Sequence, residues 1–160
     1  MEIFSKLLLM SGISADEIKQ IACSNYTTWA LKTDGTLWGC GYNYYGQQGS
    51  GNTNNVTTFT QRMTDVAQVA CSPSTTWALK TDGTLWGCGQ GGYGQQGSGN
   101  TDNVMTFTQR MTDVAQIACS HYTTWVLKTD GTLWGCGQGG SGQQGNGGMN
   151  SVLTFTERTI

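Results

Sequence analysis

The chain of 160 residues has little charge, with 11% of its residues charged and a formal net charge of −2. Its isoelectric point is near 5.1. Affinity for nucleic acid comes largely from clustered lysine and arginine, and here Lys32, Lys80 and Lys128 recur singly without forming a patch. The sequence therefore argues against a nucleic-acid partner. A low-charge surface rich in Thr, Gly, Gln and Asn favours a protein that lies packed against neighbours.

Several residue patterns that carry chemistry are also missing. The sequence has no CxxC pair and its only histidine is His121, so a zinc site of ordinary spacing is absent. The glycine-rich segment at residues 46–52 lacks the following Lys-Ser/Thr of a phosphate-binding loop, which favours a structural turn. Asp34, Asp82 and Asp130 are explained as turn residues, and no nucleophile with a base accompanies them. We expect no cofactor, no metal and no enzymatic activity.

Residues 1–12 contain an apolar stretch that Glu2 and Lys6 interrupt. The stretch is too short for a membrane span, and it lacks the basic start and small-residue cleavage site of a secretory signal. We therefore expect no membrane insertion, and a location in a virion or in the cytoplasm. Without an export signal, the six cysteines are expected to be buried free thiols, with a bridge between repeats as the open alternative.

What the sequence has in abundance is repetition with a period of 48 residues. A fixed period in the range of about 20–50 residues is typical of architectures in which one unit cannot bury its apolar face alone. We divide the chain into an N-terminal strand-like segment at residues 1–17 and three repeats at residues 18–63, 64–111 and 112–160. The positions expected to be structural are Trp29, Trp77 and Trp125, Trp38, Trp86 and Trp134, and Gly35, Gly83 and Gly131.

Within each repeat, residues 27–40 and their equivalents predict a β-hairpin. Asp34-Gly35 is a favoured pair for a two-residue type I′ turn, which needs positive φ at both positions. Such a turn would pair Leu31 with Trp38. Because side chains alternate across a strand, one face would then carry Trp29, Leu31, Trp38 and Cys40.

Two further strands are expected to flank each hairpin. Residues 18–24 predict the first strand of the first repeat, and residues 58–62 predict the last, with a Gly/Asn/Gln loop before it. Four short strands per repeat is the strand count of a propeller blade. The predicted fold class is therefore all-β, with three four-stranded propeller blades that complete a closed β-propeller by oligomerisation.

The run ALKTDGTLWGCG, followed by YGQQGSGN, resembles the regulator of chromosome condensation repeat family. The resemblance covers about residues 18–160 and implies a β-propeller, which in this family typically closes with about seven blades. This chain departs from the family where the second tryptophan of the WGWG motif is replaced by Cys40, Cys88 and Cys136, and where GQLG is replaced by GQQG. The resemblance thus implies the fold, whereas the nucleotide-exchange activity of the founding member is not carried over.

Three blades would leave two open sheet edges, a liability that proteins rarely leave exposed. We therefore expect the chain to associate with itself, and a dimer with six blades is the favoured closed ring. Residues 3–7 resemble the last strand at residues 58–62, so this extra copy is expected to pair with another subunit.

The function expected is that of a non-catalytic structural or adhesive module that binds other proteins of a larger assembly. The most specific expectation is a bacteriophage virion component such as a fibre, collar or baseplate element. The alternative is a soluble protein-binding propeller that acts as an inhibitor or scaffold. The candidate partner-binding residues lie in the variable loops and are Tyr42, Asn43, Tyr44, Tyr45, Gln90, Tyr93, Gln138 and Ser141.

Overall fold

The computed structural model describes residues 16–160, and in this part of the chain every regular element is a β-strand. The first sheet contains β1 (Ile18–Cys23), β2 (Thr27–Lys32), β3 (Leu37–Gly41) and β4 (Val56–Met63). The second contains β5 (Val66–Cys71), β6 (Thr75–Lys80), β7 (Leu85–Gly89) and β8 (Val104–Met111). The third contains β9 (Val114–Cys119), β10 (Thr123–Lys128), β11 (Leu133–Gly137) and β12 (Val152–Arg158).

Each sheet is antiparallel, and its strands are paired in the order in which they follow one another in the chain. The predicted all-β fold with three four-stranded blades is therefore confirmed. No helix long and apolar enough to cross a membrane occurs within residues 16–160. The strand-like segment at residues 3–7 lies outside the described residues.

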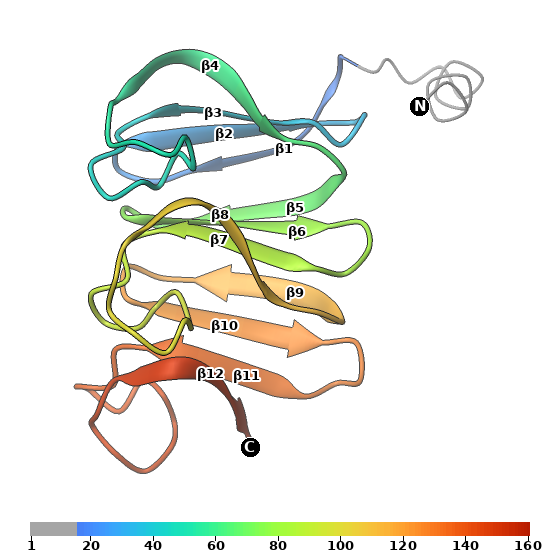
Figure 1. The fold of residues 1–160 in the computed structure, drawn as a ribbon. Helices are drawn as coiled ribbons and strands as arrows, with labels where there is room; N and C mark the ends of the chain where they lie inside the picture. Colours follow the sequence, from blue (N-terminus) through green and yellow to red (C-terminus); the bar gives the residue numbers. More distant parts are fainter. Residues whose placement is uncertain (1–15) are drawn as a thin grey trace.

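The three sheets stack on one another, with the first at the top and the third at the bottom of Figure 1. Neighbouring blades contact each other mainly through their first strands β1, β5 and β9, together with β2 and β6. The connections after the first and third strand of each blade gather on the left in Figure 1, at what we term the loop end. The tight connections between the second and third strands gather at the opposite side, the turn end.

The β2–β3 turn contains three residues, and the two-residue type I′ prediction is wrong. The amide of Gly35 donates to the carbonyl of Lys32 at 3.0 Å, and the amide of Lys32 donates to the carbonyl of Thr36 at 3.0 Å. Gly35 has φ +83, whereas Asp34 is not among the described residues with positive φ. A three-residue loop that ends with glycine in the left-handed region is the next most common hairpin connection.

The extra turn residue moves the pairing of β2 and β3 by one position. Leu31 pairs with Leu37, and Trp38 pairs with Ala30 instead of Leu31. Because the side-chain period of a strand is two, this shift places Trp38 and Cys40 on the opposite face from Trp29. The predicted shared face is therefore wrong for Trp38 and Cys40. The Lys32 Nζ atom lies 5.1 Å from the Trp38 ring centroid, within the range of a cation–π contact.

The first tryptophan of each hairpin lies over a glycine of the neighbouring strand. A Cβ atom at Gly39 would lie 2.5 Å from the ring of Trp29, so only glycine leaves room for the indole. The same relation holds between Gly87 and Trp77. Trp29 and Trp77 are fully buried, and each belongs to a hydrophobic cluster that spans two blades. The cores of this protein therefore lie between the sheets, as expected for stacked repeats.

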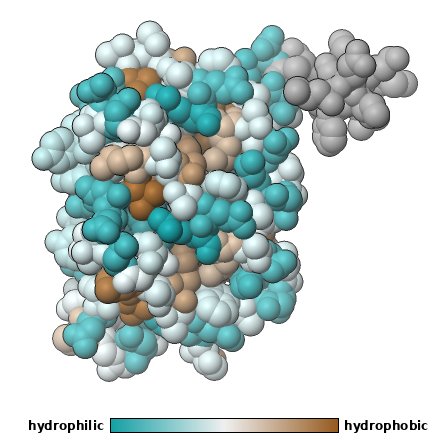
Figure 2. Space-filling view, viewed as in Figure 1, coloured by the Kyte–Doolittle hydropathy of each residue, from teal (hydrophilic) through white to brown (hydrophobic). Residues whose placement is uncertain are grey.

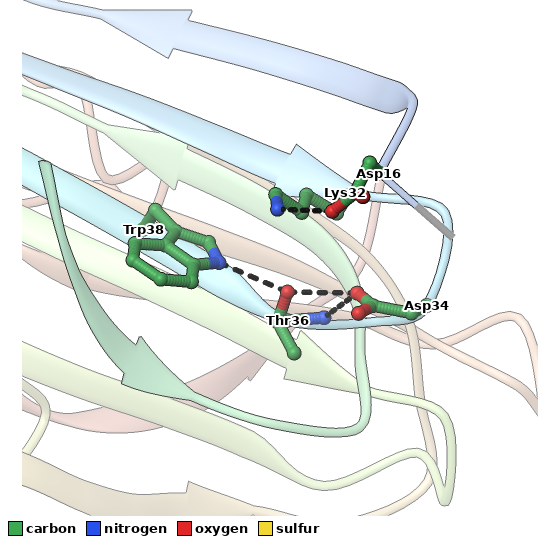
Figure 3. A network of polar contacts seen from close by, with 5 residues as sticks. All are labelled: Asp16, Lys32, Asp34, Thr36 and Trp38. Atoms are coloured by element: carbon green, nitrogen blue, oxygen red, sulfur yellow. Dashed lines mark hydrogen bonds and ion pairs between the residues drawn. The ribbon is translucent and has the colours of Figure 1, made fainter. Parts of the chain in front are cut away.

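At the turn end, a chain of hydrogen bonds joins the turn to the second tryptophan (Figure 3). The Asp34 carboxylate accepts bonds from the amide of Thr36 at 2.9 Å and from its hydroxyl at 2.7 Å. The Trp38 indole N–H in turn donates to the Thr36 hydroxyl at 3.0 Å. Lys32 forms an ion pair with Asp16 at 2.9 Å. These contacts give the aspartate, threonine and tryptophan of the DGTLW sequence a joint structural role.

The same network recurs in the second and third blades. Thr84 binds Asp82 and accepts a bond from Trp86, and Thr132 does the same with Asp130 and Trp134. The hydrogen bonds from the threonine side chain and backbone lower the pKa of Asp82 and of Asp130. The turn end is therefore nearly identical in all three blades.

Candidate functional site

The tyrosines gather at the loop end. Antiparallel pairing brings the connection after the first strand and the connection after the third strand of a blade to the same end of the sheet. These connections hold all six tyrosines of the chain and its only histidine and proline: Tyr26, Tyr42, Tyr44, Tyr45, Tyr93, Tyr122, His121 and Pro73.

Four of these tyrosines form a connected group in the first blade. The ring centroids of Tyr26 and Tyr42 are 5.7 Å apart, and Tyr42 stacks on Tyr44 with an interplanar angle of 15°. Tyr45 meets Tyr44 edge-on at 5.1 Å. Contacts of this geometry stabilise aromatic pairs, so the rings hold one another in place.

A second aromatic group joins the second and third blades. The ring of Tyr122 lies 4.4 Å from that of Tyr93 and stacks on His121 at 3.9 Å. Since Tyr93 belongs to the second blade and Tyr122 to the third, this group bridges two blades. The two groups together extend across the loop end.

Between the two groups lies a cavity of about 480 Å³ that is open to solvent. Residues from all three blades line it: Asn25, Tyr26, Tyr42, Tyr45, Pro73, Ser74 and His121. None of these lining residues is a carboxylate, a lysine or an arginine. The cavity offers aromatic faces and neutral hydrogen-bonding groups, which suits recognition of a ligand better than acid–base chemistry.

The structure divides the residues predicted from the variable loops into two kinds. Tyr44 and Tyr93 are 62% and 38% exposed, and Ser141 is also exposed, so all three can reach a partner. Tyr42 and Tyr45 are half-buried and line the cavity.

Asn43 differs from the other predicted residues because its side chain is fully buried. Its Nδ2 atom donates to the Ser50 hydroxyl at 2.9 Å and to the Asn52 carbonyl at 2.8 Å, and its Oδ1 atom accepts the amide of Gln48 at 2.8 Å. Asn43 therefore organises its loop from within and cannot touch a partner.

The other two predicted residues, Gln90 and Gln138, are half-buried, and each accepts a hydrogen bond from a neighbouring glutamine. The side chain of Gln90 accepts from Gln95 at 3.5 Å, and that of Gln138 accepts from Gln143 at 3.2 Å. They support the loop conformation from below the surface.

The prediction from the variable loops missed Tyr26, Pro73 and His121, which the fold brings to the cavity. Asn25, Pro73 and His121 occupy the same position in the three repeats, between segments that are otherwise nearly identical. Variation at this position and at the next one, which holds Tyr26, was the signal that could have identified them. The aromatic surface is thus built at the positions where the repeats differ.

The buried glutamines of the GQQG segments fix the loops that carry the surface. Gln47 accepts the amide of Tyr45 at 3.0 Å and donates to the carbonyl of Pro73 in the second blade at 3.2 Å. Gln48 donates to the carbonyl of Cys40 at 2.8 Å. Both side chains are fully buried, which gives this segment the structural role that the sequence favoured.

All six cysteines are free thiols, but the prediction that they are all buried is wrong: Cys88 and Cys136 are buried, whereas Cys23 is exposed. Burial raises the pKa of Cys71 to about 11 and that of Cys119 to about 12, and it raises the pKa of Cys88 and Cys136 further. The Cys88 thiol donates to the carbonyl of Gln47 in the preceding blade at 3.4 Å. Within residues 16–160, no group of three or more His, Cys, Asp or Glu side chains is placed to hold a metal ion.

Stacked four-stranded antiparallel sheets with their variable loops at one end define a set of β-propeller blades. The family model of the regulator of chromosome condensation (RCC1) repeat matches residues 18–47, 66–95 and 114–143, which together exceed half of the chain. A second model of the same repeat matches residues 34–79 and 82–127. The chain belongs to the RCC1 repeat family, as the sequence resemblance predicted.

Solved structures of RCC1-type proteins are similar to this chain. Human WBSCR16 is 25% identical with a TM-score of 0.76, over 89% of this chain and 38% of its own. Yeast RCC1 (Prp20) bound to Kap60 is 19% identical with a TM-score of 0.80, over 93% of this chain and 38% of its own. Prp20p from Saccharomyces cerevisiae was solved in a study of its binding to Gsp1p and histones. It is 20% identical with a TM-score of 0.80, over 93% of this chain and 39% of its own.

This chain spans less than two fifths of the length of these proteins, so it corresponds to part of a propeller. The comparison with curated proteins returned no match.

Proposed function

We propose that this chain is a protein-interaction module that binds a protein partner at its loop end. The observation that carries the proposal is the placement of all six tyrosines and the only histidine at that end, where three of the tyrosines and the histidine line one open cavity. Tyrosine supplies a large, rigid and amphipathic contact area with little loss of conformational entropy. Serine, glycine and asparagine, which surround the tyrosines here, supply adaptable hydrogen bonds. This combination is typical of protein-binding loops.

The electrostatics of the surface support a protein partner over nucleic acid. The chain carries few lysines and arginines, and none lines the cavity. Tyr26 and Tyr44 are 65% and 62% exposed, so two rings are free to enter a pocket on a partner. The similar yeast protein is solved with a protein, Kap60, bound to it.

Among protein-interaction modules, we propose more narrowly a non-catalytic component of a larger assembly such as a phage virion. The low charge and the neutral polar loops of this chain suit such a role. A gene placed among tail or capsid genes would support this role, whereas co-purification with one soluble protein would favour an inhibitor or scaffold. We also propose that the chain associates with itself, with two copies supplying six blades.

Site-specific photo-crosslinking tests the binding surface. A photoreactive phenylalanine analogue is placed at Tyr44 on the loop end and, as the matched control, at Thr81, which is exposed at the turn end. Each variant is irradiated in an extract of the source cells. We expect one discrete protein to be crosslinked from position 44 and not from position 81.

A second pair of variants relates the crosslink to the aromatic rings. Tyr26→Ala should abolish capture from position 44, and Thr81→Ala should leave it unchanged. Equal crosslinking from both ends would contradict the proposal, as would binding to glycan arrays without any protein adduct.

A further inference from the structure

The two interfaces between blades are built by the same positions. A forward face, with Trp29, Leu31 and Leu37 in the first blade, packs on a rear face of the second blade that carries Val66, Val69 and Phe107. The second and third blades repeat this arrangement with the equivalent residues. The indole of Trp29 meets Phe107 edge-on at 5.9 Å, and that of Trp77 meets Phe155 at 5.8 Å.

The first blade presents a rear face that no described residue covers. Ile21 is 74% exposed, whereas its equivalents Val69 and Ile117 are 2% and 4% exposed. Ile18 is 53% exposed, and Phe59, the equivalent of the Phe residues that pack on tryptophan, is 51% exposed. The first blade thus offers to solvent the side chains that are buried at both internal interfaces.

The third blade presents a forward face that no other blade within residues 16–160 covers. Leu127 is 37% exposed, whereas its equivalents Leu31 and Leu79 are 0% and 5% exposed. Trp125 and Leu133 are half-buried, although Trp29 and Trp77 are fully buried. This face carries the tryptophan and leucines of the internal forward faces but lacks the phenylalanine that packs against them.

The loop of the third blade holds an unfilled place for that phenylalanine. A Cβ atom at Gly97 would lie 2.4 Å from the ring of Phe155, and one at Gly49 would lie 2.5 Å from Phe107. Gly145 has nearly the same φ as Gly97, +59 against +61, but no atom lies within 4 Å of a Cβ built there. The third loop therefore has the conformation that accepts a ring in the other two blades.

Backbone hydrogen bonds also join each loop to the next blade at both internal interfaces. The amide of Gly51 donates to the carbonyl of Met105 in the next blade at 2.9 Å, and the amide of Gly99 donates to that of Leu153 at 2.8 Å. The equivalent donor in the third loop is Gly147, and the equivalent acceptor is Thr57 of the first blade.

The side of the stack in Figure 2 carries only small hydrophobic patches among hydrophilic side chains. The exposed side chains of Ile18, Ile21, Phe59 and Leu127 lie instead on the two outer faces.

From these equivalences we infer that the forward face of blade 3 in one copy docks on the rear face of blade 1 in a second copy of this chain. The occupant is a second copy because the two outer faces of this chain are complementary. The rear face of blade 1 carries the phenylalanine, Phe59, that the tryptophan on the forward face of blade 3, Trp125, lacks as a partner. The contact is head to tail, and it uses a different patch on each copy. Two copies joined twice in this way form a closed ring of six blades, within the range of known propellers. This inference rests on the proposed self-association and names its two surfaces.

The test compares three charge-introducing variants by native mass spectrometry and analytical ultracentrifugation at micromolar concentration. Ile21→Glu changes the rear face of blade 1, and Leu127→Glu changes the forward face of blade 3. Gln61→Glu is the matched control, because Gln61 is exposed and its equivalent in the third blade is the exposed Glu157. Both target side chains are exposed in the single chain, so thermal unfolding should show folded protein in all three variants.

We expect the wild type and Gln61→Glu to form dimers. For Ile21→Glu alone and for Leu127→Glu alone, the fraction of closed dimer should fall by at least tenfold. A mixture of Ile21→Glu and Leu127→Glu should form a heterodimer, because one unaltered face of each copy is then available to the other. This rescue distinguishes head-to-tail contact from pairing of two identical faces.

Each other outcome overturns the inference. A wild type that stays monomeric at micromolar concentration removes both the inference and the proposed self-association. A dimer that neither face variant disturbs keeps self-association and removes the head-to-tail surfaces. A dimer lost in only one variant, without rescue on mixing, indicates pairing of identical faces.

Discussion

The interior interfaces and the outer faces of the stack are built from equivalent residues, yet their surroundings are opposite. Val69 is buried between two blades and its equivalent Ile21 is largely exposed, although both lie on the first strand of a blade. The comparison teaches that in a repeat protein the sequence of a unit sets what its face can bury. The neighbouring unit decides whether burial occurs.

The largest expected effect separates two equivalent tryptophans. Trp77→Ala should cost about 3–5 kcal/mol of unfolding free energy, since the indole is fully buried and packs on Phe155. Trp125→Ala should cost less than half as much in the dilute monomeric chain, since no blade within residues 16–160 covers its face. Urea denaturation at submicromolar concentration measures both. Equal losses would contradict the difference between interior and outer faces.

A glycine pair sharpens the comparison while holding backbone strain constant. In Gly97→Ala and in Gly145→Ala the alanine has to adopt nearly the same left-handed φ. This conformation costs an L-residue about 1–2 kcal/mol. Only the Gly97→Ala methyl meets a ring, that of Phe155, and overpacking of this kind typically costs about 1–3 kcal/mol more. The difference in unfolding free energy between the two variants isolates the interface. A difference near zero would show that the Phe155 contact contributes nothing.

The smallest expected effect concerns the thiols between blades. Burial raises the pKa of Cys71 and of Cys119 from 9.0 to about 11 and about 12, so the unfolded chain releases these protons at lower pH than the folded chain. The contribution of these two protonated thiols to the free energy of unfolding is complete below pH 9.0 and is lost as the pH rises toward 11–12. Thermal unfolding between pH 8 and 10.5 should show a falling midpoint.

The Cys71→Ala/Cys119→Ala double variant is the control for the pH effect, and its midpoint should fall less steeply over the same range. Identical slopes in the two proteins would assign the loss to other groups.

Much of the fold could be predicted from the sequence because the signals are local and occur three times. The Asp-Gly turn, the alternating apolar residues and the fixed period define the strands of each blade. The register was missed by one residue because Asp34 holds the amide and hydroxyl of Thr36 and so stabilises a three-residue turn. That bond is invisible to a pattern that counts only which residues favour a turn, and it moves Trp38 to the other face.

The candidate site could be predicted only in part for a different reason. Tyr42, Tyr44 and Tyr45 stand out in one loop, but His121 is 76 positions further along the chain than Tyr45. Their meeting at one cavity depends on the stacking of three blades, which no local pattern encodes. Asn43 was included because of its place in the loop, yet its hydrogen bonds turn it inward.

Hydroxyl-radical footprinting over a range of protein concentrations tests the central claim most directly. The claim is that the outer faces are halves of the interface found between blades. Phe59 and Leu127 should react readily in the dilute 17.2 kDa monomer and become protected together as the chain associates, while Tyr44 at the loop end keeps its reactivity. Phe59 and Leu127 that react equally in the monomer and in the associated protein would contradict the account.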